Sequence, residues 1–416
     1  MTRPSLPRGR AFPWLVISGV LVAALSLRGP ILSVTPVLRD IAQDYGLDGA
    51  TASLLTTFPI LMFAAITPVA AVVIRRAGAE LALMACLVGV AAGTLLRTIP
   101  GFGWMLVGMI VIGAGITIGN VVIPVIIGRD VPGRQVSTVT AAYTAALNGG
   151  SLLTTLTTAS IAEATGWPLA LLLWIALTLL GIALWGLHLW RDRIPGVRWD
   201  ERATDARPGA GPSDVASLTG PVPVMNGRGE VLRNPIVWLL VAAFACQSAG
   251  YYGMSTWLPA MLGDMTGSEP AGAGALASIF QGVAIAGAFV VPALARWLPL
   301  AVPAAVVAAC WIALSTGMLL APDLFPLWVS LGGVAHAGGF VVIFTVMVAI
   351  ARSSAEAAAM SALVQGAAYL VGASSGPILG AVHEATGGWT APLTITLSLA
   401  VGFTVCLLTA VSRIRR

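Results

Sequence analysis

The sequence predicts an all-α protein that crosses a membrane many times, and three observations lead to this fold class. Hydrophobic residues make up 57% of the 416-residue chain and charged residues only 9%, whereas a soluble globular domain carries about 25% charged residues. The apolar residues gather in twelve runs, each long enough to cross a bilayer as a helix at ~1.5 Å per residue. One long polar stretch separates the first six runs from the last six.

The expected helices divide into two sets of six on either side of this polar stretch. It covers 191–234, is rich in Pro and Arg, and predicts a cytoplasmic linker with little fixed structure. We therefore expect a six-helix bundle at 1–190 and a second at 235–416. The twelve expected spans are 12–36, 50–74, 79–97, 103–127, 136–161, 168–190, 235–258, 273–295, 298–320, 327–350, 356–382 and 391–411.

Basic residues predict which side of the membrane each loop faces. All 22 basic residues are Arg, and 19 of them fall in the termini or in loops on the same side as the termini. Only Arg39 and Arg97, the latter at the end of the third span, fall on the other side. Because basic loops stay in the cytoplasm, we expect both termini to be cytoplasmic in a bacterial inner membrane. The first run is too long for a signal-peptide core, so it is expected to remain as the first helix.

Two sequence patterns recur in the two sets of helices. The Glu-Ala-Thr-Gly-Trp motif at 163–167 follows the fifth span and recurs, with one extra glycine, at 384–389 after the eleventh. Repeated six-helix units joined by a cytoplasmic linker place a substrate site at their interface near mid-membrane. The second pattern is a pair of prolines 32 or 33 residues apart, Pro36 with Pro68 and Pro259 with Pro292.

An arginine interrupts the first apolar run. Arg28 is followed at once by Gly29 and Pro30. An arginine near mid-bilayer costs at least ~2.5 kcal/mol on insertion scales, so it normally faces the protein interior or a wet cavity. Pro30 removes a backbone donor and leaves carbonyls free beside the cation. We interpret Arg28 as a fixed positive charge facing a solute path. The alternative is a side chain that extends to the outer headgroups.

Acidic residues are absent from the interior of all twelve spans. Arg28 is therefore expected to pair with water, carbonyls, an aromatic face or an anionic solute. His336 is the one titratable proton carrier available at depth, and it is the candidate for proton coupling. The alternative is a buried neutral histidine bonded to a neighbour. The four cysteines lie singly within spans, and the sequence predicts no disulfide, metal site or cofactor.

Uncharged polar residues within the spans are the other candidates for a solute site. Gln247 and Tyr251 are four residues apart and share a helix face, and Gln365 and Tyr369 repeat that spacing. An amide and a phenol can hold a small polar solute. For each residue alone, an interhelical hydrogen bond is an equally valid interpretation. The candidate substrate-binding residues are Arg28, Asn120, Tyr143, Gln247, Tyr251, Gln365 and Tyr369, with Asn148 and Gln281 as further polar neighbours.

The six-plus-six layout resembles the major facilitator superfamily, whose fold has two six-helix halves related by a pseudo-twofold axis along the membrane normal. Residues 75–80, Arg-Arg-Ala-Gly-Ala-Glu, resemble its signature between helices two and three, although Arg75 stands where the common form has an acid. A closer resemblance is to the cyanate permease and 2-nitroimidazole transporter family. It rests on LRGP at 27–30, VTP at 34–36, GNVVIP at 119–124, RDVP at 129–132, QS at 247–248, YY at 251–252, WLP at 257–259, Gln365, Tyr369, SGP at 375–377 and HEATGGW at 383–389.

This resemblance implies secondary transport of a small polar or anionic molecule. We expect Arg28 and the polar helix faces to hold the solute while the two halves tilt to open one side at a time. The sequence has no Gly-Lys-Ser/Thr phosphate loop, so gradients rather than nucleotide hydrolysis would drive transport. A drug exporter of the same fold is the main alternative. A sensor without transport and a membrane-embedded enzyme are further alternatives, and no catalytic cluster favours an enzyme. The expected partners are the solute and the bilayer, with no nucleic acid and a monomeric chain.

Overall fold

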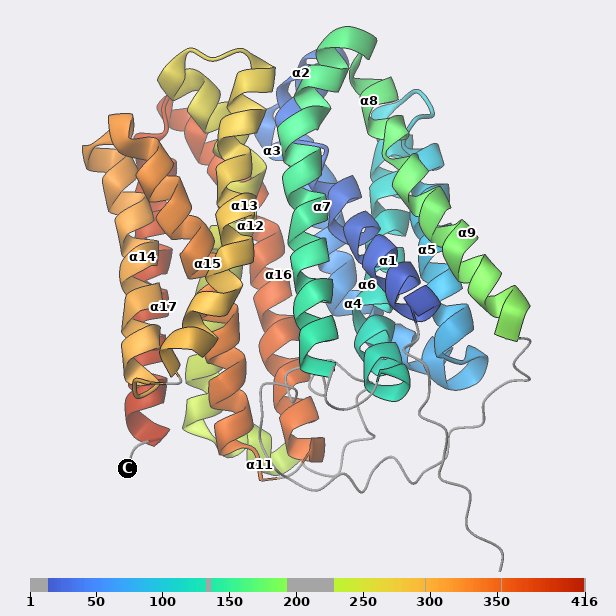
Figure 1. Cartoon of the computed structure of the whole chain (residues 1–416). Helices are drawn as coiled ribbons and strands as arrows, with labels where there is room; N and C mark the ends of the chain where they lie inside the picture. The colour runs from blue at the N-terminus through green and yellow to red at the C-terminus, as the bar shows by residue number, and fades with distance from the viewer. Residues whose placement is uncertain (1–13, 132–135, 193–227, 296, 353, 415–416) are drawn as a thin grey trace, which may run out of the picture.

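The computed structural model describes residues 14–131, 136–192, 228–295, 297–352 and 354–414 (Figure 1). In these residues all regular structure is helical. The first set of helices, here called the N-terminal half, comprises α1 (Trp14–Leu32), η1 (Thr35–Val37), α2 (Leu38–Tyr45), α3 (Gly49–Ala52), α4 (Leu54–Ala77), α5 (Ala79–Leu96), α6 (Phe102–Asp130), α7 (Val136–Thr165), α8 (Trp167–Leu173) and α9 (Ile175–Asp192). The C-terminal half comprises α11 (Arg228–Arg233), α12 (Pro235–Thr266), α13 (Pro270–Ala295), α14 (Ala301–Leu320), η4 (Pro322–Leu324), α15 (Phe325–Ile350), α16 (Ser354–Thr386) and α17 (Thr390–Ile414).

Each predicted span corresponds to a long helix or, in the sixth, to the pair α8 and α9. Ten stretches of the described residues are long and apolar enough to cross a membrane. The apolar part of α4, Leu54–Thr67, is shorter, and α7 is not among the ten. α7 is rich in Ser and Thr, whose hydroxyls bond to carbonyls of their own helix, as Ser151 does to Leu147 at 3.1 Å. α7 packs on α1 and α13, which accounts for its weaker apolar character.

The two halves lie side by side, with α7 against α13 and α4 against α16 at their boundary. Figure 1 shows the N-terminal half in blue to green beside the C-terminal half in yellow to red. The helices α2, α3 and α8 lie at one end of the bundle, here called the α2–α3 end, and α11 lies at the other, here called the α11 end. The sequence predicts that the α2–α3 end is external.

Several helix boundaries differ from the sequence prediction. The first span stops at Leu32, where the chain turns into η1. The sixth is interrupted at Trp174, between α8 and α9. α12 continues past its predicted end to Thr266, so Asp264 lies in its last turn rather than in a loop. The end of the predicted linker forms the short helix α11, and its residues 193–227 lie outside the described part of the chain.

The loop that resembles the superfamily signature retains an ion pair, although Arg75 replaces the usual acid. Glu80, in the first turn of α5, pairs with Arg129 at the end of α6, with 2.5 Å between Nη2 and Oε1. Arg129 also binds the carboxylate of Asp130 with two nitrogens, each at 2.7 Å. The acid that binds Arg129 is therefore Glu80, which lies after Gly78 of the motif, whereas the acid of the common form lies before the arginine.

Candidate functional site

Arg28 lies in the second half of α1 and turns toward neighbouring helices. It is half-buried, and its Nη1 donates to the side-chain oxygen of Asn148 on α7 at 3.3 Å. The phenols of four tyrosines lie within electrostatic range of the guanidinium, one from α7 and three from the C-terminal half: Tyr143, Tyr251, Tyr252 and Tyr369. Arg28 is thus directed to the boundary between the halves.

Close packing of α1 on α7 brings Arg28 and Asn148 together. Asn148 is 5% exposed and is followed by two glycines. A Cβ at Gly150 would clash with the carbonyl oxygen of Leu25, so only glycine permits this approach of the two backbones. Tyr143, one of the predicted site residues, is buried on the same helix. The position of Arg28 therefore depends on a small residue on the facing helix.

Both members of the predicted pair Gln247 and Tyr251 contact His336 of the facing helix α15, and the Gln247 carboxamide also packs against Gly339 of that helix. The Tyr251 ring stacks on the imidazole with 3.6 Å between centroids and 8° between planes. Gln247 donates to the backbone carbonyl of His336 at 2.9 Å. Gln281 of α13 completes the group by donating to the Tyr251 hydroxyl at 3.4 Å. The expectation that the first two share a helix face is confirmed.

Three buried polar atoms of this cluster have no hydrogen-bond partner among the described residues. They are the carboxamide oxygens of Gln247 and Gln281 and Nδ1 of His336. A buried polar atom left unpaired costs ~1–3 kcal/mol. Such atoms are normally paired with ordered water or a bound molecule. The cluster therefore has the capacity to accept additional hydrogen bonds.

The second predicted pair, Gln365 and Tyr369, also shares a face of its helix, α16. The Tyr369 hydroxyl donates to Gln365 at 3.4 Å, and Gln365 donates to Ser361 at 2.7 Å. The Tyr369 ring meets Phe63 of α4 edge to face at 5.5 Å and Phe244 of α12 at 6.3 Å. Tyr369 consequently contacts aromatic rings from both halves.

Asn120 is the predicted site residue that the structure does not join to the others. It is half-buried on α6, and no hydrogen bond connects its side chain with any described residue. Sequence reasoning also assigned no site role to Phe63, Phe244 and Tyr252, which lie around Tyr369. Single apolar residues within apolar helices carry no pattern that distinguishes them. Only the position of Tyr252 next to Tyr251 could have drawn attention to it.

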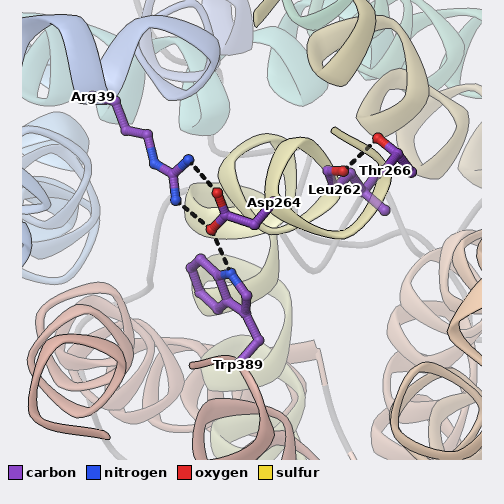
Figure 2. Close-up of polar contacts among 5 residues, drawn as sticks. All are labelled: Arg39, Leu262, Asp264, Thr266 and Trp389. Atoms are coloured by element: carbon purple, nitrogen blue, oxygen red, sulfur yellow. Dashed lines mark hydrogen bonds and ion pairs between the residues drawn. The ribbon is translucent and has the colours of Figure 1, made fainter. Parts of the chain in front are cut away.

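An ion pair joins the two halves at the α2–α3 end (Figure 2). Arg39 of α2 binds both carboxylate oxygens of Asp264 on α12, at 2.7 and 2.5 Å. The indole of Trp389 donates to the same carboxylate at 2.8 Å. The ion-paired side chains are 44% and 38% exposed, so water screens the pair. Sequence reasoning missed it because the two residues are 225 positions apart.

The repeated Glu-Ala-Thr-Gly-Trp motif makes matching contacts in its two copies. Glu163 of α7 accepts the backbone N–H of Ala271, at the start of α13 in the other half, at 3.1 Å. Glu384 of α16 accepts the backbone N–H of Gly49, at the start of α3 in the other half. Each carboxylate thus reaches the N-terminus of a helix across the boundary, where the helix dipole favours negative charge.

The tryptophans of the two motif copies bind an aspartate of their own half. Trp167 donates to Asp44 at 2.5 Å, as Trp389 does to Asp264. The motif therefore ties each half internally through Trp and to the other half through Glu.

Asp48 is the N-cap of α3 and directly precedes Gly49. Hydrogen bonds from the side chain and backbone of Thr51 hold the pKa of the Asp48 carboxyl below its ordinary value.

All hydrogen bonds that join the halves within the described residues lie at the α2–α3 end or in the first two turns of α4. Besides those above, Thr56 and Thr256 share a bond between hydroxyls at 3.1 Å, and Thr57 donates to the carbonyl of Ala373 at 2.9 Å. In the part of the chain that the structure describes, no group of three or more His, Cys, Asp or Glu side chains could hold a metal ion.

Comparison with known proteins gives results that agree with this architecture. The family model described as Major Facilitator Superfamily matches residues 16–377. The chain is 31% identical over 382 residues to the 2-nitroimidazole transporter of Escherichia coli K12, with 91% of each chain covered. It is 23% identical over 378 residues to the cyanate transport protein of the same organism, covering 89% of this chain and 90% of that protein.

A solved structure shares the fold. It is the crystal structure of a bacterial homolog of the human lysosomal transporter Spinster, in an inward-facing and unoccupied conformation. The TM-score is 0.66 at 17% identity, and the match covers 97% of this chain and 94% of that one. The predicted fold of two six-helix halves is thereby confirmed.

Proposed function

The chain belongs to the Major Facilitator Superfamily, and on that premise we propose that it is a secondary active transporter of a small polar or anionic solute. Cyanate-like anions and nitroimidazole-like compounds are the candidate solutes, because relatives that cover most of this chain carry those names. Transport would proceed by alternating access, with the solute held between the halves. We also propose a bacterial inner membrane location with cytoplasmic termini and a monomeric chain.

The observation that carries this proposal is the environment of Arg28. Its hydrogen-bond partner is an amide, so the charge of the guanidinium is not neutralised by a carboxylate at that contact. Phenols from both halves lie around it. A guanidinium binds carboxylate-like and nitro-like oxygens with two parallel donors, which favours an anion or an oxygen-rich solute over a cation.

The unpaired acceptors near Tyr251 support a polar solute on the C-terminal side of the boundary. The Gln281 side chain is 3% exposed and its oxygen lacks a partner. We propose that Gln247, Tyr251, Gln365 and Tyr369 bind the solute opposite Arg28, together with Tyr143. Asn120 is retained as a weaker member of this proposal, because no contact links it to the rest.

His336 is the proposed coupling residue. Its ring is stacked on Tyr251, and Nδ1 is buried without a partner. A proton bound there would add a second positive charge beside Arg28, so proton binding and anion binding would favour each other. Coupling of this kind would give accumulation that depends on the pH gradient.

The polar contacts at the α2–α3 end are proposed to close that end. Arg39 with Asp264, and the two motif glutamates, all cross the boundary between the halves there. We propose that the solute site opens toward the α11 end in this arrangement, and that these contacts break when the halves tilt.

A drug exporter of the same fold is the second candidate. The rings that gather around Tyr369, including Phe63 and Phe244, favour flat apolar compounds, which pack on aromatic faces. Such an exporter would accept many aromatic compounds and would not require an oxygen-rich group on them.

Counterflow in proteoliposomes tests the proposal and separates the candidates. The purified chain is loaded with unlabelled solute, and uptake of labelled cyanate and of labelled 2-nitroimidazole is followed at several pH values, with protein-free liposomes as control. We expect counterflow of one or both probes. Uptake of neither, together with uptake of unrelated aromatic compounds, would support the exporter and contradict the proposed solute class.

A further inference from the structure

A second guanidinium lies wholly inside the N-terminal half. Arg97 follows α5 and is 2% exposed. Its Nη1 donates to the carbonyl oxygen of Pro30 at 2.7 Å, and its Nη2 donates to the carbonyl oxygen of Leu171 at 2.8 Å. The sequence predicted Arg97 at the external end of the third span, and in the structure its side chain is buried there. Both of its oxygen partners are backbone carbonyls, and Nη1 also lies 3.8 Å from the sulfur of Met109, a weak acceptor.

Each of these carbonyls lies where a helix stops. The last backbone bond of α1 runs from Ser33 to Gly29, and the next amide, that of Val34, bonds to Ile31 instead of Pro30. The carbonyl of Pro30 is thus the first one that the helix leaves free. Such terminal carbonyls need a partner when they are buried. Among the described residues, the carbonyl of Pro30 has one other side-chain donor besides Arg97, the Ser33 hydroxyl, at 3.1 Å.

The second carbonyl has the same place in its own helix. α8 ends at Leu173 and α9 begins at Ile175, so the helix is interrupted at Trp174. This interruption leaves the carbonyl of Leu171 without the regular donor four residues on. One guanidinium therefore caps two helix ends and joins α1, α5 and α8, and it does so in a buried position. Positive charge is favoured at helix C-termini by the helix dipole.

Pro30, whose carbonyl Arg97 binds, is two residues beyond Arg28 in the last turn of α1, which ends at Leu32. Among the described residues Arg28 has a single side-chain hydrogen bond, at 3.3 Å to Asn148, so its direction depends on the backbone that carries it. We propose that Arg97 is a positioning residue for Arg28. By fixing the carbonyl of Pro30, it holds the last turn of α1 so that the guanidinium of Arg28 faces the solute. This inference rests on the proposed function.

Kinetics of Arg97→Gln test the proposal. Counterflow is measured with labelled 2-nitroimidazole or cyanate, whichever the wild-type chain takes up. We expect KM to rise about tenfold while Vmax per folded protein stays within about twofold. Arg97→Lys, which keeps donors and charge, should restore much of the affinity. A residue with a purely structural role would reduce the amount of folded protein and leave KM unchanged, and that result overturns the proposal.

Two further variants keep the test decisive if Arg97→Gln does not fold. Ser33→Ala removes the other donor to Pro30 and should raise KM by a smaller factor, about threefold. Thr94→Val is the matched control, because Thr94 is buried one turn earlier on α5 and its hydroxyl bonds only to Val90 of its own helix. Thr94→Val should leave KM unchanged. An unchanged KM in Ser33→Ala contradicts the proposal.

A measurement without solute separates this inference from the proposed function. In a chain whose four cysteines are replaced, Arg28→Cys is modified with a charged thiol reagent, with and without Arg97→Gln. We expect the modification rate at position 28 to change at least fivefold, while a cysteine at Trp14, at the other end of α1, reacts at the same rate. Equal rates at position 28 overturn the positioning role. Absence of transport in the wild-type chain would count only against the proposed function.

Discussion

At the scale of single residues, the charge of Arg28 is the feature on which the proposed solute class depends. A guanidinium whose partner is an amide keeps its positive charge available to a bound molecule. The sequence was sufficient to select this residue, because a cation followed by Pro30 within an apolar run is costly unless it faces the protein interior. The inward direction of Arg28 agrees with that reasoning.

We expect Arg28→Ala to abolish counterflow while the chain still folds. A hydrogen bond to a charged group contributes ~1.5–3 kcal/mol, so loss of the guanidinium should weaken solute binding about 10- to 100-fold. The fold should persist, because the side chain has only one hydrogen bond, to Asn148. Arg76→Ala, at an exposed arginine of α4, is the control. Unchanged affinity of purified Arg28→Ala would contradict the proposed role.

For His336, we expect His336→Gln to keep downhill exchange and to lose accumulation driven by a pH gradient. The amide cannot carry the coupled proton, whereas downhill exchange of solute for solute requires no net proton movement. His336→Phe is the companion variant, since it keeps a ring against Tyr251. The measurement is uptake of labelled solute by each variant with and without an imposed pH gradient. Loss of exchange in His336→Gln but not in His336→Phe would indicate that the ring is structural.

At the scale of helices, the approach of α1 to α7 determines where Arg28 lies. Leu25 and Gly150 meet backbone to backbone, and Gly29 faces Thr154 one turn further along. Small residues at such contacts are the usual means of close packing between membrane helices. The same contact also brings Asn148 to Arg28, so helix packing and the solute site are linked.

Gly150→Ala and Gly149→Ala form a matched pair that tests this link. A Cβ at Gly150 would clash with Leu25, whereas at Gly149 the nearest atom, of the Leu25 side chain, is 3.6 Å away. We expect Gly150→Ala to lose ~1–3 kcal/mol of stability by overpacking. It should also weaken solute binding, and Gly149→Ala should change neither. Thermal unfolding in detergent and solute binding are the measurements, and equal behaviour of the two variants would contradict the packing argument.

The helices and the polar pairs within one helix could be predicted, because both depend on local sequence. The Gln365 and Tyr369 contact follows directly from a spacing of four. Contacts between distant segments could not be predicted. Arg39 and Asp264 meet only after both halves pack. Arg97 stands at the end of an apolar span in the sequence, and the carbonyl of Leu171 that it binds becomes available only at the interruption at Trp174. Hydropathy also underestimates how well α7 fits a membrane, because the Ser and Thr hydroxyls that lower its hydropathy bond to carbonyls of the same helix.

At the scale of the whole molecule, the internal repeat has a physical purpose at the α2–α3 end. Duplicated halves carry duplicated contacts, so Glu163 and Glu384 each bind the start of a helix in the opposite half. The Arg39 and Asp264 pair has no counterpart of this kind and is an additional, single contact. The contacts are exposed, and exposed polar contacts of this type contribute ~1 kcal/mol or less each. Weak contacts of this size fit the proposed opening and closing of this end, because none of them would block that motion.

We therefore expect Glu163→Ala and Glu384→Ala to shift the protein toward the arrangement that is open at the α2–α3 end. A loss of ~1 kcal/mol changes the ratio of two arrangements about fivefold, and two distant substitutions should add. Asp264→Asn should act in the same direction, because it removes the charge but keeps an acceptor for Trp389.

Spin labels measure this shift as a distance between the halves. Labels at Gln43 on α2 and Ala385 on α16, both exposed at this end, would report a longer distance in each variant than in the wild type. Glu269→Ala is the control, since this exposed acid lies at the same end and its side chain has no described hydrogen bond. If the two repeat glutamates closed the end, their variants would resemble each other and differ from Glu269→Ala. A shift in only one of the two would mean that the repeated sequence does not act as a symmetric closure, and no shift in either would leave Arg39 and Asp264 as the contact that holds the end shut.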